Sequence, residues 1–225
     1  MSVVKITGLV AAIASLAGSL AQAQSPPKSV STISPIFGQL LMSGHPPGFG
    51  LAPAFEKTKD NFYIRESVPN GENVNNWTQM ITVTGMKDAA SKPEITPRIV
   101  LNNMAGGFKR ACPSSFGAQV INENKVSGFD AIVGVVSCGL SPTNAGKTSE
   151  SALMIVIKGQ ADFYTIQWAE RATPSAAPIP IELQKWSDRF KKLNPIKLCP
   201  IVPGEKAPYP SCAGSGFKQP AQRAI

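Results

Sequence analysis

The sequence predicts a single α+β domain, in which two α-helices pack on a twisted antiparallel sheet of about six to seven strands. Three observations carry this prediction. The run Phe129–Cys138 (FDAIVGVVSC) is rich in apolar β-branched residues, which is typical of a strand buried on both faces. Residues 97–112 and 181–194 instead place apolar side chains at helical spacing. Most of the other strand candidates are joined by short turns, which favours antiparallel neighbours.

The first half of the chain contains a series of strand candidates, followed by the first helix. The strand candidates are 38–43, Leu51–Lys57, Phe62–Val68 and Trp77–Thr84. Leu51–Lys57 is the weakest of them, because Pro53 interrupts it. In Trp77–Thr84 the apolar residues alternate with threonines, so we expect one apolar and one polar face.

The first helix has a clear beginning and one discordant feature. Thr96 is a suitable N-cap, and Pro97 suits the first helical position. Its apolar stripe consists of Val100, Met104 and Phe108. Gly106 and Gly107 oppose a helix by about 1 kcal/mol each relative to Ala. They either let the helix approach the sheet closely or mark an early end of the helix, and we favour close packing.

Two hairpins and a second helix follow. Residues Ala118–Glu123 turn into the central strand 129–138, and Ser151–Lys158 turn into Phe163–Glu170. The second helix, Ile181–Asn194, ends before a proline. Its apolar stripe consists of Leu183, Trp186, Phe190 and Leu193.

This order of elements resembles the PsbP/Mog1-like folds. The shared features are a strand meander opened by a Pro-Gly-aromatic turn (Pro47-Gly48-Phe49), a helix, two hairpins and a closing amphipathic helix. The resemblance covers roughly residues 38–198 and involves no diagnostic motif. Because members of this fold group serve mainly as binding or assembly factors, the resemblance implies a binding role. It transfers no functional residue to this chain.

The N-terminal segment predicts export. Lys5, the short apolar run Ile6–Leu20 and the triplet Ala21-Gln22-Ala23 form the three parts of a signal peptide. We expect cleavage before Gln24 and a periplasmic or extracellular protein with no transmembrane segment in the mature chain; a retained N-terminal anchor is the alternative. The predicted division is a signal peptide (1–23), a flexible lead-in (24–37), the α+β domain (38–198), and a disulfide-closed loop with a C-terminal tail (199–225).

Four cysteines in an exported chain predict two disulfides, for which three pairings exist. We expect Cys112 to pair with Cys138, because this bond would join the end of the first helix to the end of the central strand. We expect Cys199 to pair with Cys212, because this bond would close a proline-rich loop that has little apolar content of its own.

The formal net charge of +8 favours anionic partners, such as envelope polymers or lipid head groups. Lysine and arginine are spread along the chain, which indicates a generally basic surface instead of a dedicated patch. On the second helix, Lys185, Arg189 and Lys192 could form a basic stripe. Together with Trp77, Trp168 and Trp186, these residues are our candidates for a ligand pocket or partner surface, although core packing is the usual role of such tryptophans. No nucleic-acid partner is predicted.

Patterns that would indicate catalysis are not found in the sequence. There is no GxSxG motif, and the single histidine, His45, lies in a proline-rich turn. The acids Glu66, Glu72, Asp130 and Glu170 come from four different elements, and Asp130 is best explained as a turn cap. No metal or cofactor pattern occurs either, so we predict no catalytic, metal or cofactor residues.

These observations favour an exported, non-enzymatic binding or assembly protein of the cell envelope. Its partner would be an envelope component or another protein. Two alternatives are open: an exported enzyme with an unrecognised site, and a carrier that holds a small ligand in a cavity between helix and sheet. A deep apolar pocket beside Trp168 or Trp186 would favour the carrier.

Overall fold

The computed structural model describes residues 30–214, and these residues have the predicted α+β fold. Seven strands form an antiparallel sheet in the order β3-β4-β5-β9-β8-β7-β6. Three others form a smaller antiparallel sheet in the order β1-β2-β10. The predicted signal peptide, the start of the lead-in and residues 215–225 lie outside the described part of the chain.

The elements have the following bounds. The large sheet contains β3 (Phe55–Lys59), β4 (Phe62–Ser67), β5 (Gln79–Met86), β6 (Phe116–Val126), β7 (Phe129–Cys138), β8 (Ser149–Lys158) and β9 (Phe163–Ala172). The small sheet contains β1 (Val30–Ile36), β2 (Gln39–His45) and β10 (Lys197–Pro200). The helices are α1 (Pro97–Ala111), α2 (Leu183–Leu193) and the single turn α3 (Pro210–Ala213), and 3-10 turns occur at Ala89–Ser91 and Pro142–Asn144.

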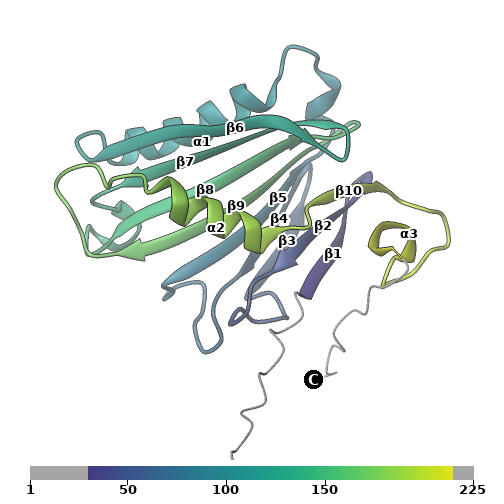
Figure 1. Ribbon diagram of the computed structural model, residues 1–225, viewed down its shortest axis with the longest axis horizontal. Helices are drawn as coiled ribbons and strands as arrows, with labels where there is room; N and C mark the ends of the chain where they lie inside the picture. The colour runs from purple at the N-terminus through teal and green to yellow at the C-terminus, as the bar shows by residue number, and fades with distance from the viewer. Residues whose placement is uncertain (1–29, 215–225) are drawn as a thin grey trace, which may run out of the picture.

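The large sheet is covered on both faces. Helix α1 packs on one face, over β6, β7 and β8, whereas α2 and the small sheet pack on the opposite face (Figure 1). Strand β7 contributes to both cores, because its side chains alternate between the faces. Val133 and Val135 point toward α2 and the small sheet, while Ile132 and Val136 point toward α1. The prediction of a central strand buried on both faces is confirmed.

The layers approach each other closely where glycines are present. Gly85 on β5 lies against β1, since a Cβ atom at this position would be 2.4 Å from Ile36 Cγ2. On the other face, Leu101 of α1 packs over Gly134 of β7, where a Cβ would be 2.9 Å from Leu101 Cδ2. The close approach of α1 to the sheet therefore depends on Gly134. It does not depend on Gly106 and Gly107, and our sequence-based explanation of those two residues is wrong.

The predicted flexible lead-in 24–37 needs a correction over its second half, since residues 30–36 form β1. Ile33 and Ile36 of this strand are buried, and β1 lies at the edge of its sheet, where the missing N–H of Pro35 is tolerated. The weak candidate 51–57 is a strand only from Phe55 onward, beyond Pro53. Strand β10 was not predicted; it pairs with β2, which lies more than 150 residues earlier in the chain.

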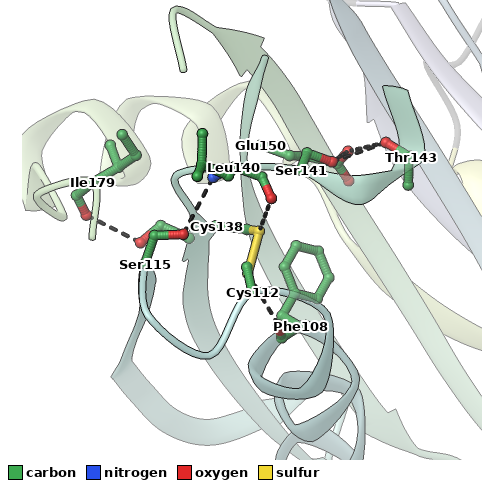
Figure 2. The surroundings of a disulfide bond; sticks show 10 residues. Phe108, Cys112, Ser115, Cys138, Leu140, Ser141, Thr143, Glu150 and Ile179 are labelled. Atoms are coloured by element: carbon green, nitrogen blue, oxygen red, sulfur yellow. Dashed lines mark hydrogen bonds between the residues drawn. A yellow bond between two sulfur atoms is a disulfide. The ribbon is translucent and has the colours of Figure 1, made fainter. Parts of the chain in front are cut away.

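The two disulfides pair the cysteines as the sequence predicts. Cys112 bonds Cys138 with a Cα–Cα distance of 5.8 Å, which joins the end of α1 to the end of β7 (Figure 2). Cys199 bonds Cys212 with a Cα–Cα distance of 5.6 Å, which joins β10 to α3. Both distances are usual for disulfides.

Candidate binding groove

Helix α1 covers only part of its face of the large sheet, and a groove runs along its uncovered side. Two adjoining cavities of about 490 and 360 Å³ form this groove, and both are lined by Met104 and Gln167. We call the two cavities together the α1 groove. The apolar residues that line it include Phe62, Met86, Val100, Met104, Phe108, Met154 and Phe163.

The local sequence explains why this groove is apolar. Val100, Met104 and Phe108 recur at helical spacing and turn the apolar stripe of α1 toward the sheet. Alternate residues of β9 face the helix, so that Phe163 lies in the core beneath α1, while Gln167 stays partly exposed. The hydroxyl groups of Thr84 and Thr165 are hydrogen-bonded to each other at 2.7 Å in the floor. The floor therefore presents mostly apolar surface.

Phe62 and Gly107 are two lining residues that face open space. Phe62, at the rim on β4, is 43% exposed. Gly107 lines the smaller cavity, of about 360 Å³, which we call the second cavity. A Cβ atom placed at Gly107 would have no neighbour within 4 Å. Gly107 thus faces open space along the helix, and no packing contact within the described residues accounts for it.

The groove is polar at the end that lies beside the C-terminus of α1. Ser141, Thr143 and Glu150 line the second cavity together with Phe108, and Figure 2 shows these residues beside the Cys112–Cys138 disulfide. Ser141 Oγ and Thr143 Oγ1 lie 3.2 and 3.3 Å from Glu150 Oε2 and are hydrogen-bonded to it. The groove therefore changes from apolar to hydrogen-bonding along its length.

Arg171 contacts two residues of this polar end, Glu150 and Thr143. Its Nε atom lies 3.8 Å from Glu150 Oε2, and its Nη2 donates a hydrogen bond to Thr143 Oγ1 at 3.1 Å. The guanidinium group is stacked over the ring of Trp77, 3.7 Å from its centroid. The side chains of Arg171 and Glu150 are only 12% and 13% exposed, so the two charges compensate each other away from bulk water.

The predicted tryptophans do not form one site. Trp168 and Trp186 are each 2% exposed and belong to the core between the large sheet and α2, on the opposite face from the α1 groove. Trp168 Nε1 donates a hydrogen bond to Gln79 Oε1 at 2.9 Å. Trp77 packs in a separate cluster with Val68 and is near the groove only through Arg171.

The predicted basic stripe on α2 is largely engaged within the chain. Lys185 Nζ lies 2.7 Å from Glu170 Oε2, and Arg189 forms an ion pair with the other oxygen of the same carboxylate. Arg189 also lies over the Trp168 ring, at 4.9 Å from its centroid. Of the three predicted residues, Lys192 is exposed and has no ion pair with another described residue.

The polar residues considered for catalysis also lie apart. His45 Nε2 donates a hydrogen bond to the backbone carbonyl of Phe49 at 3.1 Å. Asp130 is exposed, and its hydrogen bond with Lys125 lowers the pKa of the carboxyl group. Burial raises the pKa of Glu66, which lies on β4.

Two further findings apply to residues 30–214. No group of three or more His, Cys, Asp or Glu side chains there is arranged to hold a metal ion. None of the helices in this part of the chain has the length and apolar character needed to cross a membrane.

Sequence reasoning did not find the polar end of the groove. Ser141 and Thr143 belong to a loop rich in Ser, Thr, Asn and Gly that carries no order signal, and Glu150 is the second residue of the strand after it. The apolar part had one signal, which was the discordant Gly107 beside the stripe of Met104 and Phe108, and we interpreted it wrongly as close packing.

Comparison with known proteins gives no family: no protein-family model matches the sequence, and no curated protein matches it. Solved structures do match. A Bacteroides thetaiotaomicron protein is 12% identical, with a TM-score of 0.40, over 79% of this chain and 50% of that one. The Saccharomyces cerevisiae Ran-binding protein Mog1p is 12% identical, with a TM-score of 0.38, over 73% of this chain and 84% of that one. LpqN of Mycobacterium tuberculosis, which is involved in cell envelope biogenesis, is 13% identical, with a TM-score of 0.35, over 76% and 91%.

These likenesses concern the fold alone. Mog1 is a member of the fold group that the order of elements resembles. This chain spans half the length of the Bacteroides protein. Identities and TM-scores of this size carry no inference about function.

Proposed function

We propose that this chain is an exported, non-catalytic binding protein of the cell envelope, and that it holds the apolar part of an envelope component in the α1 groove. The observation that carries this proposal is the groove itself: an apolar channel between α1 and the sheet, with cavities of about 490 and 360 Å³. Ligand sites in proteins typically have volumes of roughly 300–1,000 Å³, are mostly apolar and contain a few polar groups.

The exposed apolar surface supports a binding role. An apolar ligand that fills the groove would remove apolar surface from water, which is favourable. The partly buried Met86 and Met104 contribute to the lining, and flexible methionine side chains adapt to ligands of different shape. Strongly shifted pKa values often mark catalytic groups. Burial raises the pKa most for Tyr63 and Tyr164, and both lie on the opposite face of the sheet from the groove, in the core with Trp168. The groove therefore has the character of a binding surface.

Two adjacent glycines allow a direct test of the groove. Gly107→Phe would place a ring in the second cavity, where a Cβ meets no neighbour within 4 Å. Gly106→Phe is the matched control, because Gly106 is beside Gly107 but is not among the lining residues. Binding is measured by the fluorescence of the uncharged apolar probe N-phenyl-1-naphthylamine. We expect Gly107→Phe to weaken binding about tenfold or more, and Gly106→Phe to leave it near wild type. Equal binding by wild type and both variants would exclude the groove as the binding site of the probe.

Export has its own test. Two disulfides fit an exported protein, since such bonds persist in oxidising compartments. Mass spectrometry of protein recovered from the periplasm or medium should find a chain that begins at Gln24. Recovery of the intact chain from Met1 in the membrane fraction would contradict this part of the proposal.

A further inference from the structure

The polar end of the α1 groove is built around one nearly buried carboxylate. Glu150 is 13% exposed and lines the second cavity. Its Oε2 atom is hydrogen-bonded to Ser141 and Thr143 and lies near Arg171. Its Oε1 atom accepts no hydrogen bond from another described residue. This oxygen is not fully buried, and a carboxylate oxygen can only accept hydrogen bonds, so a group that binds here should donate.

The charges at this end favour an uncharged group. Arg171 compensates the charge of Glu150 from 3.8 Å, and it is held in place by the Trp77 ring and by its hydrogen bond to Thr143. An anion in this cavity would lie against the carboxylate of Glu150, while a cation would compete with a positive charge already present. Either ion would also lose hydration water on entering the cavity, which costs free energy. A hydroxyl group can donate to Glu150 without these costs.

The apolar part of the groove gives the rest of the ligand. Met104 and Gln167 line both cavities, so the apolar channel leads from the Phe62 rim past these two residues to Glu150. The residues of α1 between Val100 and Ala111 line it over about 16 Å, at 1.5 Å per helical residue. Such a channel suits an extended hydrocarbon chain lying along the helix.

We infer that the ligand of the α1 groove is an amphiphile with an extended hydrocarbon chain and an uncharged, hydroxyl-bearing head group, and that Glu150, Ser141 and Thr143 hold this head group. The inference rests on the proposed function and adds the chemical class of the ligand. In it, Glu150 accepts a hydrogen bond from a head-group hydroxyl, and the chain lies against Met104. Glu150 is then the residue that sets the head-group preference.

The experiment compares three probes that share a twelve-carbon chain. They are 1-monolauroylglycerol, dodecylphosphate and dodecyltrimethylammonium, which carry a hydroxylated, an anionic and a cationic head group. Each is used below its critical micelle concentration to displace N-phenyl-1-naphthylamine from the full mature chain. We expect 1-monolauroylglycerol to displace the probe at about tenfold lower concentration than either ion, as expected for one additional hydrogen bond to a charged group.

Variants at the polar end test the role of Glu150. Glu150→Gln removes the charge and leaves Arg171 uncompensated, so we expect weaker binding of 1-monolauroylglycerol and tighter binding of dodecylphosphate. Thr143→Val, at an exposed position, should weaken only the hydroxylated probe, and it keeps the test open if the first variant folds poorly. Glu123→Gln is the control, because Glu123 is an exposed acid on β6 that pairs with Arg98, away from the groove.

The possible outcomes separate this inference from the proposed function. Equal displacement by dodecylphosphate or dodecyltrimethylammonium would overturn the head-group assignment, as would an unchanged order of affinities in both polar-end variants. In either case the groove would still be a binding site if Gly107→Phe weakens probe binding. If no twelve-carbon probe competes while Gly107→Phe still acts, an apolar segment of a protein partner is favoured and the amphiphile is excluded. If Gly107→Phe has no effect, the proposed function itself is wrong.

Discussion

The carboxylate of Asp162 accepts a hydrogen bond from the backbone N–H of Gly38, at 3.1 Å, although the two residues are 124 positions apart. Gly38 lies in the turn between β1 and β2, and Asp162 lies in the turn between β8 and β9, so this bond joins the two sheets. Asp162 Oδ1 also accepts a hydrogen bond from the backbone of Asp88 at 2.7 Å. The hydroxyl of Tyr164 lies 3.1 Å from Asp162 Oδ2, and burial together with this carboxylate raises the pKa of the tyrosine.

Asp162→Ala should destabilise the protein strongly. The substitution removes a carboxylate that is only 3% exposed, and with it the acceptor of the Gly38 and Asp88 N–H groups and of the buried Tyr164 hydroxyl. We expect a loss of about 2–4 kcal/mol in the free energy of unfolding, measured by urea denaturation. The control Asp188→Ala, on the exposed face of α2, should cost less than about 0.5 kcal/mol. Similar values for the two variants would show that Asp162 does not hold the sheets together.

The central strand provides a second prediction. Val135 is 1% exposed in the core that faces α2, so Val135→Asp would bury an unpaired charge. We expect the melting temperature to fall by about 10 °C or more, or the chain not to fold. Val120→Asp on the neighbouring edge strand β6 is the matched control, because Val120 is 40% exposed. A melting temperature of Val135→Asp within a degree or two of wild type would contradict the burial of β7.

Local sequence patterns were sufficient to predict the elements whose side chains repeat regularly. The helical stripe of α1 and the apolar run of β7 each depend on a few neighbouring residues, and both are confirmed. The Cys112–Cys138 disulfide followed from these elements, because the two cysteines stand at their ends. An amphipathic period determines which face is buried before any distant contact is known.

Features that depend on distant pairing were not predicted. Strand β1 was missed for a different reason: its serines and Pro35 suggested a flexible segment, although it pairs with the adjacent β2 in a hairpin. Strand β10 is four residues long and pairs with β2 from the far end of the chain. The polar end of the groove likewise needs Arg171, Glu150 and the loop containing Ser141 to meet in space. No local period specifies such contacts.

Two glycines should respond to the same substitution in opposite ways. Gly85→Ala places a Cβ 2.4 Å from Ile36 Cγ2, at the close contact between the sheets, so we expect a loss of about 1–3 kcal/mol. Gly107→Ala adds a methyl group with no neighbour within 4 Å, in the interior of α1, so we expect a gain of up to about 1 kcal/mol. Thermal unfolding of both variants provides the measurement. A loss at Gly107 or a gain at Gly85 would show that the packing on that face of the sheet differs from this description.

The last prediction concerns the pH dependence of stability through Glu66. Its side chain is half-buried on β4 and forms no ion pair with another described residue, and burial raises the pKa of its carboxyl group. Because the pKa is higher in the folded protein than in the unfolded chain, the folded state binds this proton more tightly. The contribution of Glu66 to stability is therefore lost as the pH rises from the unfolded pKa through the folded one.

Glu66→Gln removes this titration. We expect the variant to melt about 1–2 °C above wild type at pH 7, a small effect because water screens a half-exposed carboxylate, and to match wild type near pH 3, where both carry an uncharged side chain. Calorimetry at the two pH values measures the difference. Glu123→Gln on β6, where the acid is exposed and paired with Arg98, should show no gain at pH 7. A Glu66→Gln difference that is the same at both pH values would mean that a change in packing, and not the charge of Glu66, causes it.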